Sequence, residues 1–173
     1  MVQSRSFLAA RFNIEMVADV RRFRASGAAP AHFNWQPLCE MLKEERIGYR
    51  QIEGPYRRSW RISSPATNSS NGGWANANFR GYADHMQTSE FASALGELVT
   101  RAKEATVANM CAESLWWKCH RRLLPDALST AGMAVQHIFP NGRSEPHVFT
   151  PFALTSGRNV IYPARQRALE LSV

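Results

Sequence analysis

The segment from Met110 to Arg122 holds the side chains best suited to chemistry, and it reads Met-Cys-Ala-Glu-Ser-Leu-Trp-Trp-Lys-Cys-His-Arg-Arg. Glu113 follows an apolar stretch that is typical of a buried strand. A carboxylate at the end of a strand can be partly desolvated and made more basic, so Glu113 is a candidate general base or nucleophile. The alternative is a structural carboxylate that pairs with Arg121 or Arg21 and orders the loop.

Cys119 is a second candidate nucleophile. It stands at the start of a predicted helix beside Lys118 and Arg121, and such surroundings lower the pKa of a thiol. No glycine-rich phosphate loop follows it, which makes this role secondary to that of Glu113. Cys119 lies eight positions after Cys111, whereas zinc knuckles place cysteines roughly two to four residues apart. We therefore predict no metal site and no cofactor.

Four basic residues gather around the same helix start: Lys118, His120, Arg121 and Arg122. Free backbone N–H groups and positive side chains at a helix start form an anion site, and phosphate fits it. The alternative is a solvated basic turn, although cations near a helix N-terminus are mildly unfavourable. Trp116 and Trp117 precede the cluster and could stack on a nucleobase, or could instead belong to the core.

Strand and helix patterns alternate along the chain. Short apolar runs predict strands at residues 15–20, 48–52, 106–112 and 133–139, with a possible fifth at 159–162. Helical spacing predicts a helix capped by Asn34, another from Thr88 to about Lys103, and a third over 120–131 that ends at Gly132. Pro125 should delay the start of this third helix or kink it. A long loop spans 53–78, and a C-terminal extension covers 140–173.

This alternation predicts an α/β fold, with a mostly parallel sheet and flanking helices in a single domain over residues 1–173. Ligands of such sheets bind beyond the carboxyl ends of the strands. Asp19 and Arg21 end the first strand, so Asp19 is a third catalytic candidate and Arg21 a further phosphate contact. A structural ion pair between them is the favoured alternative.

Composition narrows the class of protein. The 173 residues are 45% hydrophobic, enough for one core, and carry a formal net charge of +7 that attracts anionic partners. An odd count of three cysteines argues against a disulfide framework and for a reducing compartment. No apolar run is long enough to span a membrane. We therefore expect a cytoplasmic protein that binds nucleic acid or a phosphorylated small molecule; the sequence leaves its oligomeric state open.

Several motifs agree in order and spacing with one known family. They are the segment 110–122, Val-Ala-Asp-Val-Arg at 17–21, Gly-Tyr at 48–49, Gly-Tyr-Ala-Asp-His-Met at 81–86 and Val-Gln-His-Ile at 135–138. From about Phe7 to Pro163 the chain resembles the domain of unknown function 488 family, some of whose members carry a DNA-repair label. The resemblance also implies an additional first strand with a Thr-Ile-Gly-His-like motif, which this sequence lacks.

These residues predict an enzyme that acts on nucleic acid or a nucleotide-like phosphorylated substrate. Glu113 would supply the acid/base or nucleophilic carboxylate, assisted by Asp19 and Cys119. Arg21 and the basic cluster would hold phosphate. The sequence leaves two alternatives open, a non-catalytic module that binds nucleic acid or a phosphorylated ligand, and an inactive truncated family member. A buried Glu113 in a closed pocket would favour chemistry, and an exposed one would favour binding.

Overall fold

A three-stranded parallel sheet lies at the centre of the predicted α/β fold. The computed structural model describes residues 9–21, 34–52, 69–111, 113 and 115–164. Within these residues β1 (Met16–Asp19) pairs with both β2 (Gly48–Gln51) and β3 (Val107–Met110), in the order β2-β1-β3. Asp19 is level with Gln51 and with Met110, so the carboxyl ends of all three strands share one edge of the sheet. The α/β class and the parallel sheet are confirmed.

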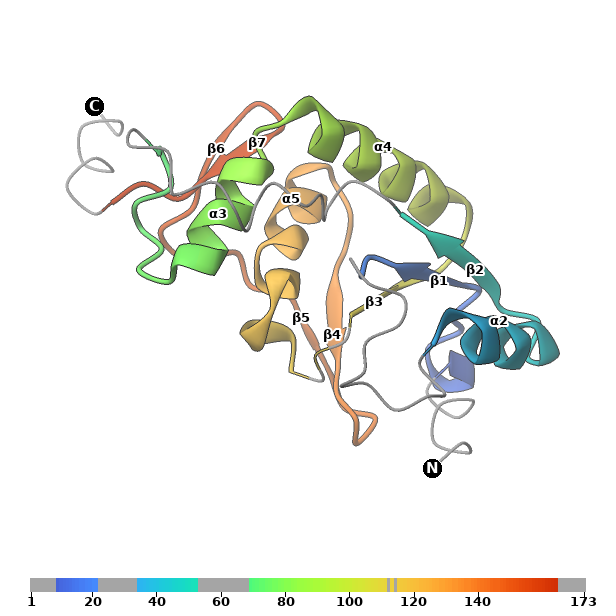
Figure 1. Ribbon diagram of the computed structural model, residues 1–173. Helices are drawn as coiled ribbons and strands as arrows, with labels where there is room; N and C mark the ends of the chain where they lie inside the picture. The colour runs from blue at the N-terminus through green and yellow to red at the C-terminus, as the bar shows by residue number, and fades with distance from the viewer. Residues whose placement is uncertain (1–8, 22–33, 53–68, 112, 114, 165–173) are drawn as a thin grey trace.

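Helices cover both faces of this sheet. The connection from β1 to β2 contains α2 (Trp35–Glu44), and the return connection to β3 contains α3 (Ala77–His85) and α4 (Ser89–Glu104). The two crossovers run in opposite directions across the sheet, so right-handed connections place α2 and α4 on opposite faces. Figure 1 shows this arrangement, with α2 and α4 on either side of the strands.

Local sequence signals account for the helix starts. Asn34 precedes α2, as expected, although its side chain makes no capping hydrogen bond. The Thr88 hydroxyl oxygen accepts the Phe91 backbone N–H at 3.3 Å and caps α4, also as expected. The helix α3 was not predicted, because its buried residues include a glycine, an alanine and a histidine, which do not form an apolar helical pattern.

The predicted helix over 120–131 is shorter than expected. Two 3₁₀ turns come first, η3 (Trp116–Lys118) and η4 (His120–Arg122), and α5 covers only Leu124–Thr130. Pro125 stands in the first turn, where its missing N–H is harmless, so the helix starts late. Gly132, at φ +84°, ends α5 as predicted. The basic cluster therefore precedes the helix, and the placement of these residues in its first turn was wrong.

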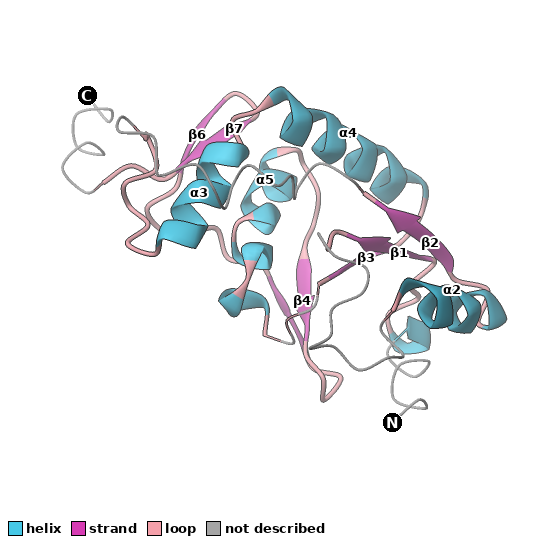
Figure 2. Ribbon diagram, viewed as in Figure 1, coloured by secondary structure: helices cyan, strands magenta, loops and turns pink. Residues whose placement is uncertain are grey.

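Two antiparallel hairpins follow α5 (Figure 2). The first joins β4 (Gln136–Ile138) to β5 (Ser144–Pro146), and the second joins β6 (Leu154–Ser156) to β7 (Asn159–Ile161). The predicted fourth strand exists, but its assignment to the parallel sheet was wrong. A tight turn in which the Phe139 N–H donates to the Arg143 carbonyl at 2.8 Å supplies a nearer partner strand. The fifth predicted strand corresponds to β7.

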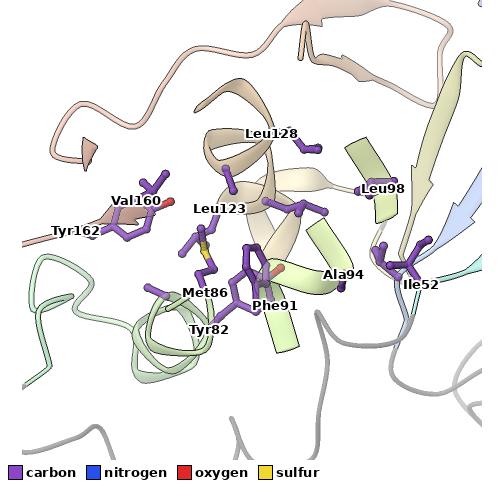
Figure 3. Close-up of a cluster of buried hydrophobic side chains, with 14 of the residues drawn as sticks. Ile52, Tyr82, Met86, Phe91, Ala94, Leu98, Leu123, Leu128, Val160 and Tyr162 are labelled. Carbon is purple, nitrogen blue, oxygen red and sulfur yellow. The ribbon is translucent and has the colours of Figure 1, made fainter. Parts of the chain in front are cut away.

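The main core lies where α3, α4 and α5 meet (Figure 3). Tyr82, Phe91, Leu98 and Leu123 are buried there, together with Tyr162 from the C-terminal extension. The extension therefore contributes to the same core as the helices. Residues 53–68 of the predicted long loop lie outside the described residues. No helix in the described segments has the length and apolar character needed to cross a membrane.

Candidate functional site

A cavity of about 600 Å³ runs along the unpaired edge of β3. Its walls are mostly apolar and come from α2, α4, α5, β3 and residues 133–138. Near the carboxyl end of β3 the lining becomes polar, with Asn109, Cys111, Trp116, Arg121 and His137. Small-molecule sites commonly have roughly 300–1,000 Å³, apolar walls and a few convergent polar groups. This cavity therefore has the size and lining of a ligand site. It runs along the side of β3, and only its polar end lies near the carboxyl ends of the strands, where the sequence predicted a site.

Cys119 lies against the polar end of the cavity, although it is not itself among the lining residues. Its side chain is hydrogen-bonded to that of Cys111. The Arg121 backbone N–H and Nε donate to the Cys119 sulfur at 3.4 and 3.3 Å. In the thiol form Cys119 can instead donate to the Trp116 carbonyl oxygen at 3.7 Å. Several donors thus converge on one sulfur.

These contacts make the two cysteines chemically different. The hydrogen bond from Cys111 and the charge and N–H groups of Arg121 lower the pKa of Cys119 from 9.0 to about 6. The hydrogen bond to Cys119 and burial raise the pKa of Cys111. We assign the thiolate to Cys119 because the two N–H donors of Arg121 lie on its sulfur. At neutral pH the site therefore pairs a Cys119 thiolate with a Cys111 thiol.

Glu113 contributes to this site through its backbone. The Arg121 Nη2 donates to the Glu113 carbonyl oxygen, which orients the guanidinium beside the cysteines. The Glu113 carboxylate is exposed and has no ion-pair partner in the part of the chain that the structure describes. By the criterion stated from the sequence, this exposure favours binding over acid/base chemistry at Glu113.

Asp19 and Arg21 reach the predicted edge of the sheet but not the cavity lining. The Asp19 carboxylate accepts Arg21 Nε at 2.9 Å, Arg21 Nη2 at 2.7 Å and the Tyr49 hydroxyl at 2.7 Å. Asp19 is fully buried and Arg21 is 7% exposed. This geometry is the structural ion pair that the sequence analysis favoured. Only part of the predicted cluster is thus brought together at the cavity.

The other basic residues of the cluster diverge from Arg121. The guanidinium of Arg122 lies over the Trp74 ring at 4.7 Å, against the aromatic part of the core. Lys118 is exposed. The side chain of His120 lies outside what the structure describes. Among the predicted phosphate contacts whose side chains are described, Arg121 is the one that lines the cavity.

The two tryptophans have different surroundings. Trp116 lines the cavity, and one face of its ring stacks on His137 with 3.8 Å between ring centroids and 8° between planes. Trp117 meets Trp116 edge to face and is 38% exposed. The indole Nε1 of Trp116 and the Oδ1 of Asn109 are buried and have no hydrogen-bond partner among the described residues. Buried polar atoms of this kind are rare in native proteins.

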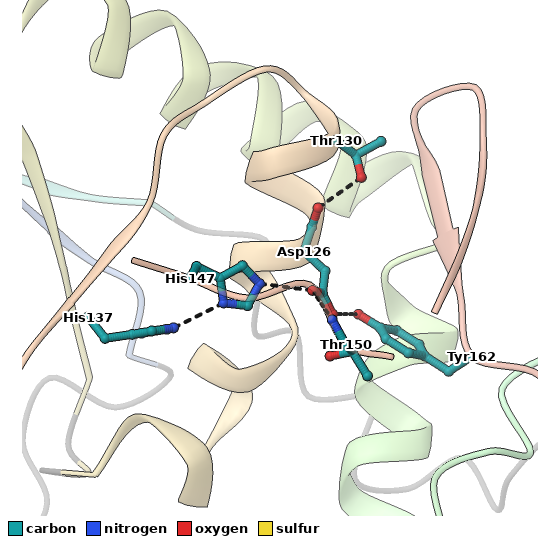
Figure 4. A network of polar contacts seen from close by, with 6 residues as sticks. All are labelled: Asp126, Thr130, His137, His147, Thr150 and Tyr162. Carbon is teal, nitrogen blue, oxygen red and sulfur yellow. Dashed lines mark hydrogen bonds and ion pairs between the residues drawn. The ribbon is translucent and has the colours of Figure 1, made fainter. Parts of the chain in front are cut away.

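Sequence reasoning missed a chain of hydrogen bonds that ends at this stack (Figure 4). Asp126, on α5, lies 2.9 Å from His147 Nε2 and also accepts the Thr150 N–H and the Tyr162 hydroxyl. His147 Nδ1 is 3.0 Å from His137 Nε2. His137 lies in the Val-Gln-His-Ile motif at 135–138, but no motif predicts its contacts, because the members of the network are spread over residues 126–162 and meet only in the fold. The described residues hold no cluster of three His, Cys, Asp or Glu side chains suited to a metal ion.

Comparison with known proteins places the chain in a family. No curated protein and no solved structure is similar to it. The family described as "Domain of unknown function DUF488" matches residues 5–128. This segment holds the sheet, α2 to α4, both cysteines of the site and Arg121, whereas His137 and His147 lie beyond it. The match covers more than half of the chain, so the chain belongs to the DUF488 family.

Proposed function

We propose that this protein is an enzyme that acts on a nucleotide-like phosphorylated substrate bound in the cavity beside β3. The observation that carries the proposal is the Cys119 sulfur, on which three donors converge and whose donors Cys111 and Arg121 line the polar end of the cavity. The thiolate of Cys119 attacks an electrophilic centre of the substrate, and the leaving group departs with the electrons of its bond. Arg121 attracts the phosphate.

The cavity supports a nucleotide-like ligand in two ways. Its apolar walls suit the flat faces of a base, and its polar end carries one fixed cation, Arg121. A nucleotide within a DNA strand, and hence a role in DNA repair, is the finer form of this proposal.

A second candidate function is binding of a nucleic acid strand without catalysis. The observation that favours it is the surface formed by Trp117, which is 38% exposed, and the neighbouring exposed Lys118. An exposed aromatic ring beside a cation can stack on a base and contact a phosphate. The exposed carboxylate of Glu113 fits this alternative better than it fits acid/base catalysis.

Calorimetric titration with a nucleoside 5′-monophosphate, the matching nucleoside and inorganic phosphate tests the proposal. We expect the monophosphate to bind most tightly. Arg121→Gln should weaken its binding about tenfold or more, because a charge-assisted hydrogen bond contributes about 1.5–3 kcal/mol. Arg101→Gln is the matched control, since Arg101 is an exposed residue of α4 whose partner is Glu104.

Turnover is then followed by chromatography of the same nucleotide, and of a short single-stranded DNA, in the wild type and in Cys119→Ser. Consumption that stops in Cys119→Ser supports the enzyme. Binding of DNA with no consumption of either compound supports the binding module. Equal effects of Arg121→Gln and Arg101→Gln, or no binding of the monophosphate, would contradict the cavity as the site.

A further inference from the structure

The hydrogen bonds between Asp126 and His137 have a defined direction. Asp126 Oδ1 already accepts the Thr150 backbone N–H at 3.0 Å, so it acts as an acceptor. His147 Nε2, at 2.9 Å from the same oxygen, is therefore the donor. A neutral His147 then has a lone pair on Nδ1, and the His137 Nε2–H donates to it at 3.0 Å. Neutral His137 therefore carries its proton on Nε2, and its Nδ1 is unprotonated.

His137 is the member of this chain that reaches the cavity. His137 is 6% exposed and lines the cavity with Trp116 and Arg121, whereas His147 and Asp126 are not among the lining residues. Nδ1 of His137 makes no hydrogen bond within the described residues, and it is not among the buried polar atoms that lack a partner. The stacked Trp116 ring fixes the plane of the imidazole.

We propose that His137 is the acid–base residue of the cavity and that His147 and Asp126 are positioning residues that relay its proton. The inference rests on the proposed function, and it assigns the second half of that reaction. A water molecule attacks the group held on Cys119, its oxygen forms the new bond, and the thiolate leaves. The water proton goes to His137 Nδ1, and the Nε2 proton of His137 passes to His147 Nδ1. The positive charge then rests on His147, beside the Asp126 carboxylate.

The charges around the His137 and His147 rings favour a proton transfer that ends with the positive charge on His147. Burial, together with the charges of His147 and Arg121, lowers the pKa of His137 from 6.5 to about 4. His137 therefore stays neutral near pH 7 and holds a positive charge poorly. His147 has a carboxylate 2.9 Å from its Nε2, which stabilises an imidazolium. Among the described residues, Arg121 from η4 and Asp126 from α5 are the charged groups beside this pair, and Glu145 of β5, which pairs with Arg143, is level with His137 in the hairpin. The Asp126 carboxylate contacts His147, so a proton taken up at His137 is drawn inward to His147.

Asp126 is held in place independently of the histidines. Tyr162, from the segment after β7, donates its hydroxyl to Asp126 Oδ2 at 2.8 Å. Burial and Asp126 raise the pKa of Tyr162, so that hydroxyl keeps its proton and remains a donor. One carboxylate oxygen thus faces the relay while the other is fixed from the opposite side. Tyr162→Phe removes one hydrogen bond to Asp126 Oδ2 but keeps the Asp126 carboxylate and both histidines, which makes it a matched control.

Long-range ¹H–¹⁵N NMR of the histidine rings tests the relay in the protein without substrate, so the result does not depend on whether a nucleotide binds. We expect neutral His137 and His147 to carry their protons on Nε2. As the pH falls, His137 should stay neutral to about pH 4. A proton on His137 Nδ1 in the neutral protein, or protonation of His137 near the ordinary histidine pKa of 6.5, would overturn the proposal.

Variants separate a relay from a purely structural network. Asp126→Asn should redistribute the ring protons of His147 and His137, because an asparagine side chain can donate to His147 Nε2 as well as accept from it. Tyr162→Phe should leave the ring tautomers unchanged. If Asp126→Asn does not fold, the wild-type tautomers still decide the question. Ring tautomers that are the same in Asp126→Asn as in the wild type would also contradict the relay.

Discussion

Cys119 and Glu113 show how much a side chain's surroundings add to its chemical type. Both lie in the same short segment, and sequence reasoning ranked Glu113 first. The fold surrounds the sulfur of Cys119 with Arg121 and Cys111 and leaves the carboxylate of Glu113 exposed. The preference for Cys119 over Glu113 could not be predicted from the sequence, because the donors on Cys119 depend on the turn at η4 and on where β3 ends.

A prediction about Cys119 follows from its contacts. In a Cys39→Ser background, ultraviolet absorbance of the thiolate should rise with a midpoint near pH 6. The cause is the set of hydrogen bonds and the positive charge that stabilise the ionised sulfur. Cys111→Ala should move the midpoint upward toward 9.0, since it removes the largest of these contributions. Cys111→Ser keeps a hydroxyl donor and should move it less.

The control for this titration is Cys119→Ser, which should abolish the transition near pH 6. A transition that persists in that variant would belong to another group. A wild-type protein in which no thiolate forms below about pH 8 would contradict the assignment of Cys119 as the reactive sulfur.

Glu113→Gln provides a second prediction at this scale. The backbone carbonyl of Glu113, not its carboxylate, accepts from Arg121, so the variant keeps that hydrogen bond. We expect the melting temperature to change little, because surface substitutions of this kind usually change stability by less than about 0.5 kcal/mol. Affinity for a nucleoside monophosphate should hold or rise slightly, because a negative charge near the site is removed. Calorimetry and thermal melting check both.

The opposite outcomes would each be informative about Glu113. Loss of turnover by about a hundredfold with unchanged binding would restore this carboxylate as the acid/base group. A fall in stability of roughly 3–5 kcal/mol would show that it pairs with a buried cation.

At the level of elements, periodic apolar patterns predicted the structure well and irregular ones did not. The strands of the sheet follow from short apolar runs, and the helices α2 and α4 follow from apolar residues at helical spacing. A folded chain buries both kinds of pattern. The helix α3 has no such pattern, because small and polar residues occupy its buried face. The partner of β4 could not be predicted either, since β4 presents the same strand pattern in a hairpin as in a parallel sheet.

The same limit applies to the relay. A histidine and an aspartate in separate elements carry no sequence signal of their contact. Asp126, His147 and Tyr162 meet only because the residues that follow β5 and β7 lie against α5. By contrast, Asp19 and Arg21 are two positions apart at a strand end, so their pairing could be predicted.

A close approach between elements gives a third prediction, at Gly73. Its N–H donates to the Tyr162 carbonyl at 2.8 Å, and a Cβ there would lie 2.7 Å from the Pro163 carbonyl oxygen and 2.9 Å from Phe152 Cδ2. Gly73→Ala should therefore lower the free energy of unfolding by about 1–3 kcal/mol, since backbone would have to shift. Urea denaturation measures this change.

Gly96→Ala is the matched control for that substitution. Gly96 is exposed within α4, and nothing lies within 4 Å of its added Cβ. Alanine in a helix interior should raise stability by about 0.5–1 kcal/mol. A Gly73→Ala protein as stable as the wild type would show that residues 72–74 and the segment after β7 are not packed as described.

On the scale of the whole molecule, the positively charged side chains have different roles. The net charge is +7, yet Arg21 is held by Asp19 and Arg122 lies over the ring of Trp74. These two cations are committed to the fold and add little to direct contact with a ligand. Arg121 lines the cavity, and Lys118 is exposed next to it in the sequence. We therefore expect anion binding to depend on a few residues near η3 and η4 and not on the net charge alone.

The salt dependence of the affinity for single-stranded DNA distinguishes contacts with a few residues near η3 and η4 from attraction by the net charge alone. If about three phosphates are contacted, the logarithm of the association constant should fall with the logarithm of salt concentration with a slope of about −2, because each contact contributes about −0.7. Fluorescence anisotropy at several ionic strengths measures the slope. Lys118→Gln should reduce its magnitude by about 0.7. Lys103→Gln is the control, since Lys103 precedes β3 at the end of the sheet away from Cys111 and should not change the slope. Equal effects of the two substitutions would mean that DNA is attracted only by the overall charge. Undetectable binding at low salt would exclude nucleic acid as the partner. The cavity could then still bind a small phosphorylated molecule.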